Sequence, residues 1–360
     1  MSDRHLPPTA LTEAGWLGTV VAVQANFYRV QIDRAAEPPK FSLLCTRRTR
    51  LKKIGQQVMV GDRVVVEEPD WEGERGAISD VLPRRTELDR PPVANADCVL
   101  LVFALAEPSI DPIQLSRFLI KAESTQLDVQ LCLNKSDLVG EEEREQWRDR
   151  LRQWGYDPLL LSVRTAWGVD DLARRLRDRV TILAGPSGVG KSSTIDRLVP
   201  AADVRVAGVS GKLKRGRHTT RHVELFELPN GGLLADTPGF DRPELDCLPR
   251  ELPRYFPEIQ RRLDLETCQF SDCFHREEPN CAVRGTWERY DHYLMFVEEA
   301  IVRQEERQQL GDRESTLKLR TKKNGQRYYE PKLASKKYRR LSRRQQHQNL
   351  QELCEDLEDI

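Results

Sequence analysis

Near its middle the chain reads Val180-Thr181-Ile182-Leu183-Ala184-Gly185-Pro186-Ser187-Gly188-Val189-Gly190-Lys191-Ser192-Ser193. The apolar first part predicts a buried strand, and the residues from Ser192 onward open a predicted helix. The glycines between them let backbone N–H groups converge on phosphate oxygens, and the positive end of the helix faces the same anion. Such a pattern also occurs by chance in long sequences, but the strand before it and the helix after it support a phosphate-binding loop. Lys191 is expected to reach the β- and γ-phosphates, and the Ser192 hydroxyl is expected to ligate Mg²⁺.

A second polar motif, Asn134-Lys135-Ser136-Asp137, follows the apolar stretch 129–133. This places it at the carboxyl end of a predicted parallel strand, where open α/β sheets hold their ligands. The Asp137 carboxylate can accept hydrogen bonds from the ring N–H and the 2-amino group of guanine, while Asn134 meets the other edge of the base. Adenine offers neither donor, so GTP rather than ATP is expected. An ATP-dependent kinase or ATPase would leave this tetrapeptide without a purpose.

The order of the two motifs is reversed relative to ordinary GTPases, in which the phosphate loop comes first. The reversal predicts a circularly permuted nucleotide domain. In such a domain, the segment that senses the γ-phosphate runs directly into the part of the chain that follows it.

Two further segments complete the predicted site. Asp236-Thr237-Pro238-Gly239 ends an apolar stretch, so Asp236 can hold a water of Mg²⁺ and the Gly239 N–H can approach the γ-phosphate. The basic stretch 211–220 ends in Gly216-Arg217-His218-Thr219-Thr220 and predicts a mobile switch, in which Thr220 is preferred over Thr219 as the residue that completes the Mg²⁺ shell. The GTP-binding residues expected are Asn134, Lys135, Ser136, Asp137, Ser162 (through its backbone), Gly185, Pro186, Ser187, Gly188, Val189, Gly190, Lys191, Ser192 and Ser193.

Phe240 stands where many GTPases place the glutamine that orients the attacking water. A phenylalanine cannot do this. Either hydrolysis is slow until a partner completes the site, or His218 orients the water from the first switch. The alternative that His218 only caps a loop is equally open.

A third cluster of residues, Cys268, Cys273, His275 and Cys281, has the spacing C-x4-C-x-H-x5-C. Three thiolates and one imidazole make a complete tetrahedral shell for Zn²⁺ with no open position, so one structural zinc is expected. His292 competes with His275 as a ligand, but only His275 falls within the group of thiols. The eight cysteines of the chain otherwise lie singly, which favours metal ligation over disulfides.

Composition and hydropathy narrow the classes of protein. No run approaches the roughly 18 apolar residues of a membrane span, and the start lacks the apolar stretch of a secretory signal, so a cytoplasmic protein is expected. The formal net charge is zero, but it hides a basic stretch from Lys318 to Arg344 and an acidic end from Glu352 to Asp359. The region after Gln304 is expected to be helical in parts and poorly packed.

The N-terminal part has short apolar alternations separated by glycines, which predict a small antiparallel barrel of five strands. Its basic hairpin, Arg47, Arg48, Arg50, Lys52 and Lys53, suits an OB-type fold that lays nucleic acid across one face. These charges by themselves could equally be a solvated loop. We expect a flexible N-terminus at 1–14, an OB domain at 15–85, a permuted α/β GTPase domain at 86–241, a mainly α zinc domain at 242–303 and a charged extension at 304–360.

Together, the permuted motifs, Gly-Arg-His-Thr-Thr, Asp-Thr-Pro-Gly-Phe and the zinc spacing resemble the bacterial small-ribosomal-subunit-dependent GTPases, the RsgA or YjeQ family. The resemblance covers about residues 15–300. It implies an OB domain, a circularly permuted GTPase domain and a zinc domain that together bind the 30S subunit during late maturation, with ribosome-stimulated GTP hydrolysis linked to release. The partners expected are the 30S subunit with its 16S rRNA and GTP or GDP, and a monomer is expected. It also implies the base, phosphate and zinc roles given above. Arg221 replaces an expected third threonine, and the extension is longer than the resemblance explains. A rival interpretation, favoured by Phe240, is an RNA-binding scaffold in which GTP is a switch or structural ligand with negligible turnover.

Overall fold

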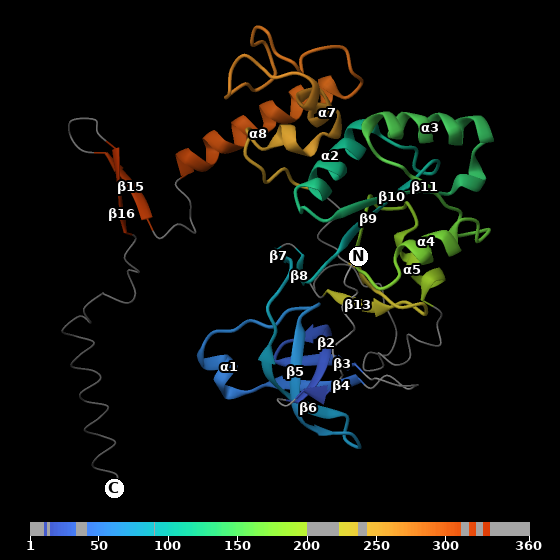
Figure 1. Cartoon of the computed structure of the whole chain (residues 1–360), viewed down its shortest axis with the longest axis vertical. Helices are drawn as coiled ribbons and strands as arrows, with labels where there is room; N and C mark the ends of the chain where they lie inside the picture. The colour runs from blue at the N-terminus through green and yellow to red at the C-terminus, as the bar shows by residue number, and fades with distance from the viewer. Residues whose placement is uncertain are drawn as a thin grey trace, which may run out of the picture. The chain divides into compact units, whose positions relative to one another are not determined.

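The computed structural model describes residues 11–12, 15–33, 42–89, 91–199, 223–236, 243–310, 317–321 and 327–331 (Figure 1). The chain divides into two compact units, Met1–Val297 and Glu298–Ile360, which are described separately below. No helix in the described ranges is both long enough and apolar enough to cross a bilayer.

The N-terminal part of the first unit is a closed barrel. Its elements are β2 (Gly15–Gln24), β3 (Phe27–Ile32), β4 (Ser42–Arg47), α1 (Thr49–Lys53), β5 (Arg63–Asp70) and β6 (Arg75–Val81), with β1 (Leu11–Thr12) paired to β2. The pairing runs β2-β3-β4-β6-β5 and closes from β5 back to β2, and only the β4–β6 pair is parallel. Alternate side chains of these strands, such as Val20, Val30 and Ile78, fill the barrel core. The predicted five-stranded OB-type barrel is therefore confirmed, but it is not wholly antiparallel. The basic residues expected on a hairpin lie instead at the end of β4 and on helix α1.

The central part is a doubly wound sheet with the order β11-β10-β9-β12-β14-β13. The elements are β9 (Cys98–Ala104), α2 (Pro112–Glu123), β10 (Asp128–Asn134), η1 (Ser136–Leu138), α3 (Glu141–Trp154), β11 (Leu159–Leu160), α4 (Val169–Arg175), β12 (Val180–Ala184), α5 (Lys191–Leu198), β13 (Glu224–Glu227) and β14 (Leu233–Asp236). Five neighbouring strands are parallel and β13 is antiparallel at the end. The strand predicted at Val180–Ala184 is confirmed as β12, and the one predicted at 129–133 is confirmed as β10, which is one residue longer at each end, whereas β13 was not predicted.

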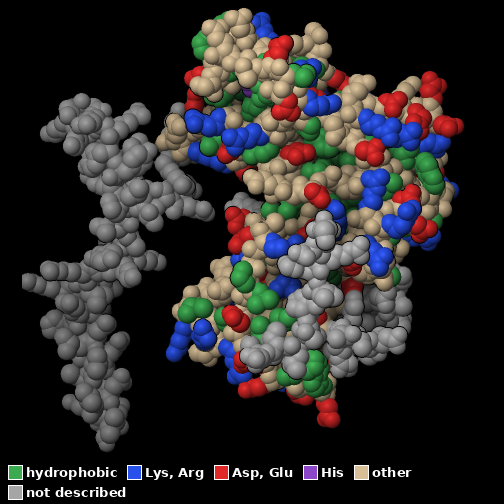
Figure 2. Space-filling view, in the orientation of Figure 1, with side chains coloured by type: hydrophobic (Ala, Val, Ile, Leu, Met, Phe, Trp, Pro, Cys, Tyr) green, Lys and Arg blue, Asp and Glu red, His purple; other side chains and the backbone are tan. Residues whose placement is uncertain are grey.

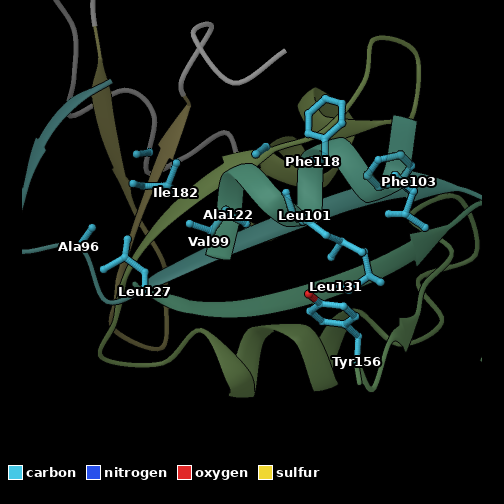
Figure 3. Packing of buried hydrophobic residues seen from close by; sticks show 14 of the residues in the cluster. Ala96, Val99, Leu101, Phe103, Phe118, Ala122, Leu127, Leu131, Tyr156 and Ile182 are labelled. Atoms are coloured by element: carbon cyan, nitrogen blue, oxygen red, sulfur yellow. The ribbon is translucent and has the colours of Figure 1, made fainter. Parts of the chain in front are cut away.

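Helices cover both faces of this sheet (Figure 1). Side chains of α2 and α3 pack on one face, and those of α4 and α5 pack on the other. Every residue of β9 is buried because the strand lies between β10 and β12. Figure 3 shows the first of these clusters, in which the ring of Phe118 from α2 meets the ring of Phe103 from β9 edge-on, with centroids 5.4 Å apart. The two packed faces fix the strand ends that carry the polar motifs.

The barrel and the sheet share a strand pair. Glu224 of β13 pairs antiparallel with Ala22 of β2, so the barrel strands and the parallel strands belong to one continuous sheet. Val21 and Val23 of β2 pack against the same cluster as Leu225 of β13. A short hairpin, β7 (Glu87–Asp89) and β8 (Pro92–Ala94), follows the barrel in the chain.

The segment after β14 contains η4 (Leu252–Tyr255), α7 (Pro257–Leu265) and the start of α8 (Tyr290–Leu310). These helices agree with the mainly α character expected for this segment. The second unit contains the rest of α8 and an antiparallel pair, β15 (Leu317–Thr321) and β16 (Arg327–Pro331). The expectation of only helical pieces there missed this pair, although Asn324-Gly325 between two alternating segments is a strong hairpin signal. Figure 2 shows acidic and basic side chains interspersed over one face of the molecule.

Candidate functional site: a nucleotide cleft edge and a metal cluster

The predicted nucleotide residues meet at the carboxyl edge of the central sheet. Parallel strands β10, β12 and β14 end at Asn134, Ala184 and Asp236, and each polar motif begins at or directly after one of these ends. Strands β9 and β12 pair in register, and β9 pairs with β10, which fixes the separation of the motifs. Residues 50 or more positions apart in the chain therefore share one edge.

The phosphate loop is held against the sheet by close backbone contacts. Gly185 has a φ of +139°, and a Cβ at this position would lie 2.1 Å from the Val102 carbonyl oxygen, so only glycine fits. Helix α5 begins at Lys191, directly after Gly190 in a left-handed conformation. The Lys191 ammonium donates to the carbonyl oxygens of Gly185 and Pro186 at 2.7 and 2.8 Å. The Lys191 side chain thus lies across the backbone of its own loop, beside the N-terminal turn of α5, where backbone N–H groups can bind an anion.

Asn134 joins the base motif to the phosphate loop. Its side-chain amide donates to the Val189 carbonyl oxygen at 2.9 Å, and its Oδ1 accepts from the Val163 N–H at 3.2 Å. The side chain is buried, and a Cβ on Gly190 would lie 2.4 Å from its Nδ2. The two motifs that the sequence separates by some 50 residues are therefore in direct contact.

Asp137 lies exposed at the rim of this edge. Its Oδ1 accepts from the buried Ser162 hydroxyl at 2.6 Å, which orients the carboxylate. Ser136 is anchored beneath it, because its N–H donates to the Leu161 carbonyl at 3.1 Å. Lys135 has left-handed backbone angles, and its ammonium donates to the Glu107 carbonyl oxygen of the loop after β9. The structure thus brings Ser162 to the base motif through its hydroxyl, while the predicted backbone contact of Ser162 to the base stays a prediction. It adds Glu107 and Val163, which carry no motif in the sequence.

The predicted Mg²⁺ residues are only partly described. Ser192 lies exposed in the first turn of α5, and Asp236 ends β14, in register with Leu183 of the neighbouring β12. Thr220, His218, Gly239 and Phe240 lie outside the described residues. Their predicted roles therefore stay predictions.

The four predicted zinc ligands converge. The ligand atoms of Cys268, Cys273, His275 and Cys281 all lie within 4.8 Å of one another. His275 Nδ1 lies 3.5 Å from Cys268 Sγ and 3.4 Å from Cys281 Sγ, and the two sulfurs are 3.9 Å apart. A tetrahedron with zinc–sulfur arms of about 2.3 Å and a zinc–nitrogen arm of about 2.0 Å has edges of about 3.5 to 3.8 Å. The three distances among Cys268, His275 and Cys281 are therefore close to the edges of such a tetrahedron, and Cys273 Sγ lies within 4.8 Å of all three atoms.

The surroundings of the cluster favour metal binding. Burial lowers the pKa of His275, and the charge of Glu278 opposes this shift without reversing it. The lowered pKa keeps the imidazole neutral, so that its lone pair is available to a metal. Tyr290 and Tyr293 on α8 donate to the carbonyl oxygens of His275 and Phe274 at 2.9 and 2.8 Å. These supporting residues were not predicted, because isolated tyrosines carry no sequence signal for such a role.

His292 lies apart from the metal cluster. Its Nδ1 is 2.8 Å from the Ser116 hydroxyl on α2, and its ring meets Trp154 edge-on. His275, and not His292, is thus the histidine of the cluster. Nearby, the fully buried Arg289 pairs with Glu258 through two hydrogen bonds, and its guanidinium lies 4.7 Å from the ring centroids of both Trp154 and Phe256. This pair links the cluster's segment to the end of α3.

The fold and the site define a P-loop GTPase whose base-reading strand precedes its phosphate loop, which is a circular permutation. The family model described as "RsgA GTPase" matches residues 81–246. "Small ribosomal subunit biogenesis GTPase RsgA 1" from Nostoc sp. is 62% identical over 95% of this chain and 98% of its own length. The RsgA of Synechocystis sp. is 53% identical over 97% of this chain and 99% of its own. The chain belongs to the RsgA GTPase family.

Two solved structures share the fold. YjeQ from Thermotoga maritima superposes with a TM-score of 0.65 at 31% identity, covering 79% of this chain and 98% of its own. YloQ, described as a circularly permuted GTPase, gives a TM-score of 0.65 at 30% identity, covering 80% of this chain and 95% of its own. The predicted family resemblance and the predicted fold class are both confirmed.

Proposed function

We propose that this chain is a Mg²⁺-dependent GTP hydrolase that acts in biogenesis of the small ribosomal subunit, binding the 30S subunit through 16S rRNA and releasing it after ribosome-stimulated hydrolysis. The observation that carries the proposal is that Asn134 donates to the Val189 carbonyl oxygen and accepts from the Val163 N–H. This contact between the segment 134–137 and the loop 185–192 supports a single nucleotide bound across both. The names of the relatives support the ribosomal role.

The roles in hydrolysis follow from charge and position. Lys191 would bind the β- and γ-phosphates, and Ser192, Thr220 and, through a water, Asp236 would hold Mg²⁺. Gly239 senses the γ-phosphate through its N–H. Asp137 accepts from the guanine ring, and Asn134 fixes the distance between base and phosphates. Mg²⁺ held by these residues would neutralise the charge that develops on the γ-phosphoryl oxygens.

One zinc ion held by the four-residue cluster has a structural role in this proposal. All four ligand positions come from the protein, so the ion has no open site for substrate. It would fix the loop between α7 and α8, which is otherwise made mainly of turns.

The barrel is the proposed RNA contact. Among its five predicted basic residues, two have partners within the protein: Arg47 donates to the Gln56 carbonyl at 2.7 Å, and Arg48 pairs with Glu67 and Glu68. The exposed Arg50, Lys52 and Lys53 have no such partner among the described residues, so they remain available for phosphates. Phe27 on the neighbouring β3 is 49% exposed and offers a ring for base stacking.

The decisive experiment is multiple-turnover phosphate release from GTP, titrated with purified 30S subunits. We expect turnover to rise with 30S concentration and saturate, and to be lost in Lys191→Ala. If nucleotide binds but 30S subunits leave the rate unchanged, the scaffold interpretation holds instead. A competition assay with ATP distinguishes the GTPase and the GTP-binding scaffold from an ATPase, because only an ATPase would bind ATP in preference to GTP.

A further inference from the structure

The turn that carries Asp137 is too short to orient its own carboxylate. It consists of the three residues of η1, closed by one hydrogen bond of 3.0 Å from the Leu138 N–H to the Lys135 carbonyl. A single 3₁₀ turn has little intrinsic stability, because several dihedral angles are fixed for one hydrogen bond. The direction of Asp137 must therefore be set by contacts from outside the turn.

One contact comes from helix α3. Arg144 Nη1 donates to the Ser136 carbonyl oxygen at 3.0 Å and to the Val139 carbonyl oxygen at 3.3 Å. These two carbonyls stand on either side of Asp137 and Leu138. A cation bound to both fixes the two ends of the turn, and charge-assisted hydrogen bonds of this kind are stronger than neutral ones.

A second contact places an indole over the same guanidinium. The Arg144 Cζ lies 5.3 Å from the centroid of the Trp167 ring, which is within the range of a cation–π interaction. Trp167 stands between two residues with left-handed backbone angles, Ala166 at φ +65° and Gly168 at φ +77°. A Cβ at Gly168 would lie 2.3 Å from the Leu160 carbonyl oxygen. The backbone therefore holds Trp167 in place at some conformational cost.

The contacts close into a ring around the base-reading carboxylate. The Trp167 carbonyl accepts from the Ser162 N–H at 2.9 Å, and the Ser162 hydroxyl in turn donates to Asp137 Oδ1 at 2.6 Å. The path runs from Asp137 through Ser162, Trp167 and Arg144 and back to the two ends of the η1 turn. The two segments expected to face guanine, the η1 turn with Asp137 and the segment after β11 with Ser162, both belong to this ring.

We propose that Arg144 and Trp167 are specificity-determining positioning residues, which preorganise Asp137 to accept hydrogen bonds from the guanine N–H and 2-amino groups. The proposal rests on the proposed GTP-binding function of the site. Both residues act through Asp137 and Ser162. A carboxylate that is already held in place binds without a further ordering cost. Arg144 and Trp167, here called the brace, therefore strengthen binding of the guanine base and not binding of the phosphates.

The test compares GDP with IDP, which has the same ribose and phosphates but lacks the 2-amino group. Binding of both is measured by calorimetry for wild type, Arg144→Ala and Trp167→Ala. We expect GDP affinity to fall roughly tenfold in each variant while IDP affinity falls much less, so that about 1.4 kcal/mol of guanine discrimination disappears. In the double variant the two losses should be less than additive, because they interrupt one ring.

Two matched variants distinguish positioning from general damage. Trp167→Tyr keeps an aromatic face and should retain most of the discrimination. Arg152→Ala removes a guanidinium from the same helix, where it pairs with Asp157, and should leave both affinities unchanged. If Arg144→Ala does not fold, Trp167→Ala on its exposed loop gives the same comparison.

An unchanged GDP-to-IDP ratio in the alanine variants overturns the proposal, and so does an equal loss of affinity for both nucleotides. A wild-type chain that binds GDP and IDP equally well overturns the guanine-reading role of Asp137 itself, and the brace with it. That result is recognised without any variant, so failure of the proposed function and failure of this inference are distinguishable.

Discussion

At the scale of single residues, the site depends on side chains that hold one another before any ligand is present. The sequence predicted Asn134 as a residue that meets the edge of the base. The structure shows both ends of its amide engaged by protein, with Val163 and with Val189. Asn134 is therefore a spacer between the two halves of the site, and its loss would separate base reading from phosphate binding.

Asp137→Asn should shift nucleotide preference from guanine to xanthine. A carboxamide can donate to the 2-oxo group of xanthine, whereas it offers the 2-amino group of guanine a poorer acceptor. We expect GDP affinity to fall by tenfold or more and XDP affinity to rise, as measured by competition against a fluorescent nucleotide. Asp149→Asn, on the exposed face of α3, is the control and should change neither. Unchanged guanine selectivity in Asp137→Asn would contradict the assignment.

The identities of the ligand-facing residues could be predicted from the sequence, because each belongs to a motif with a defined chemistry. Their supporting partners could not. Glu107, Arg144 and Trp167 make their contacts through a backbone carbonyl, a guanidinium and an indole ring that any surface residue could present. Which of them meet the site depends on the register of β9, β10 and β11, and a sequence pattern does not determine register to one residue.

At the scale of elements, the junction between strand β12 and helix α5 depends on how closely it approaches strand β9. Buried apolar stretches predicted the parallel strands well, since strands covered on both faces are continuously apolar. Strand β13 was missed because it has only two apolar residues, Leu225 and Phe226, between Glu224 and Glu227 at its ends. Its position is set by pairing with β14 and β2 and not by local composition.

Gly185→Ala should damage this junction. The new methyl group would lie 2.1 Å from the Val102 carbonyl oxygen, at a φ that L-residues rarely adopt, so either β9 or the loop must move. We expect a loss of about 1–3 kcal/mol in the free energy of unfolding, measured by urea denaturation, and a loss of nucleotide affinity.

The matched control is Gly140→Ala. This glycine precedes α3 with a φ of −69°, and a Cβ there meets nothing within 4 Å. The free energy of unfolding of the Gly140→Ala variant should differ from that of the wild type by less than about 0.5 kcal/mol. Equal effects of the two substitutions would show that the close approach to Val102 has no energetic weight.

The loop between α7 and α8 is predicted to depend on its metal. Cys281→Ser should remove one of the four ligands. The zinc content of the purified variant, measured by inductively coupled plasma mass spectrometry, should therefore fall well below one ion per chain. Because metal binding and folding are coupled in such loops, the melting temperature of the variant should drop, and a chelator should lower that of the wild type. Cys247→Ser, a half-buried thiol outside the cluster, should keep its zinc. Full zinc content in Cys281→Ser would contradict the assignment of ligands.

At the scale of the whole molecule, the charges are arranged unevenly along a chain of zero net charge. The barrel contributes the three available cations of α1, and the extension beyond α8 contributes the stretch from Lys318 to Arg344. This arrangement is consistent with a partner that is bound in several places, where each neutralised phosphate adds a salt-dependent increment to affinity.

Truncation after Leu310 keeps α8 intact and removes the basic extension. We expect weaker binding to 30S subunits and a shallower dependence of log K on log salt concentration, by about 0.9 for each duplex phosphate that the shortened chain no longer neutralises. Truncation after Arg344 removes only the acidic end and is the control, which should bind at least as tightly as the full chain. An identical salt slope for all three proteins would mean that the extension does not touch RNA.

The ladder between Glu224 and Ala22 bears on how the protein can be divided. Without this pairing, β13 would be the edge strand of the nucleotide sheet, with a row of unpaired N–H and C=O groups. Exposed edge strands of this kind pair with strands of other chains. The barrel thus covers part of an edge strand that would otherwise be exposed. A fragment lacking residues 1–85 would expose that edge and self-associate, so for this protein the smallest well-behaved GTPase fragment includes the barrel.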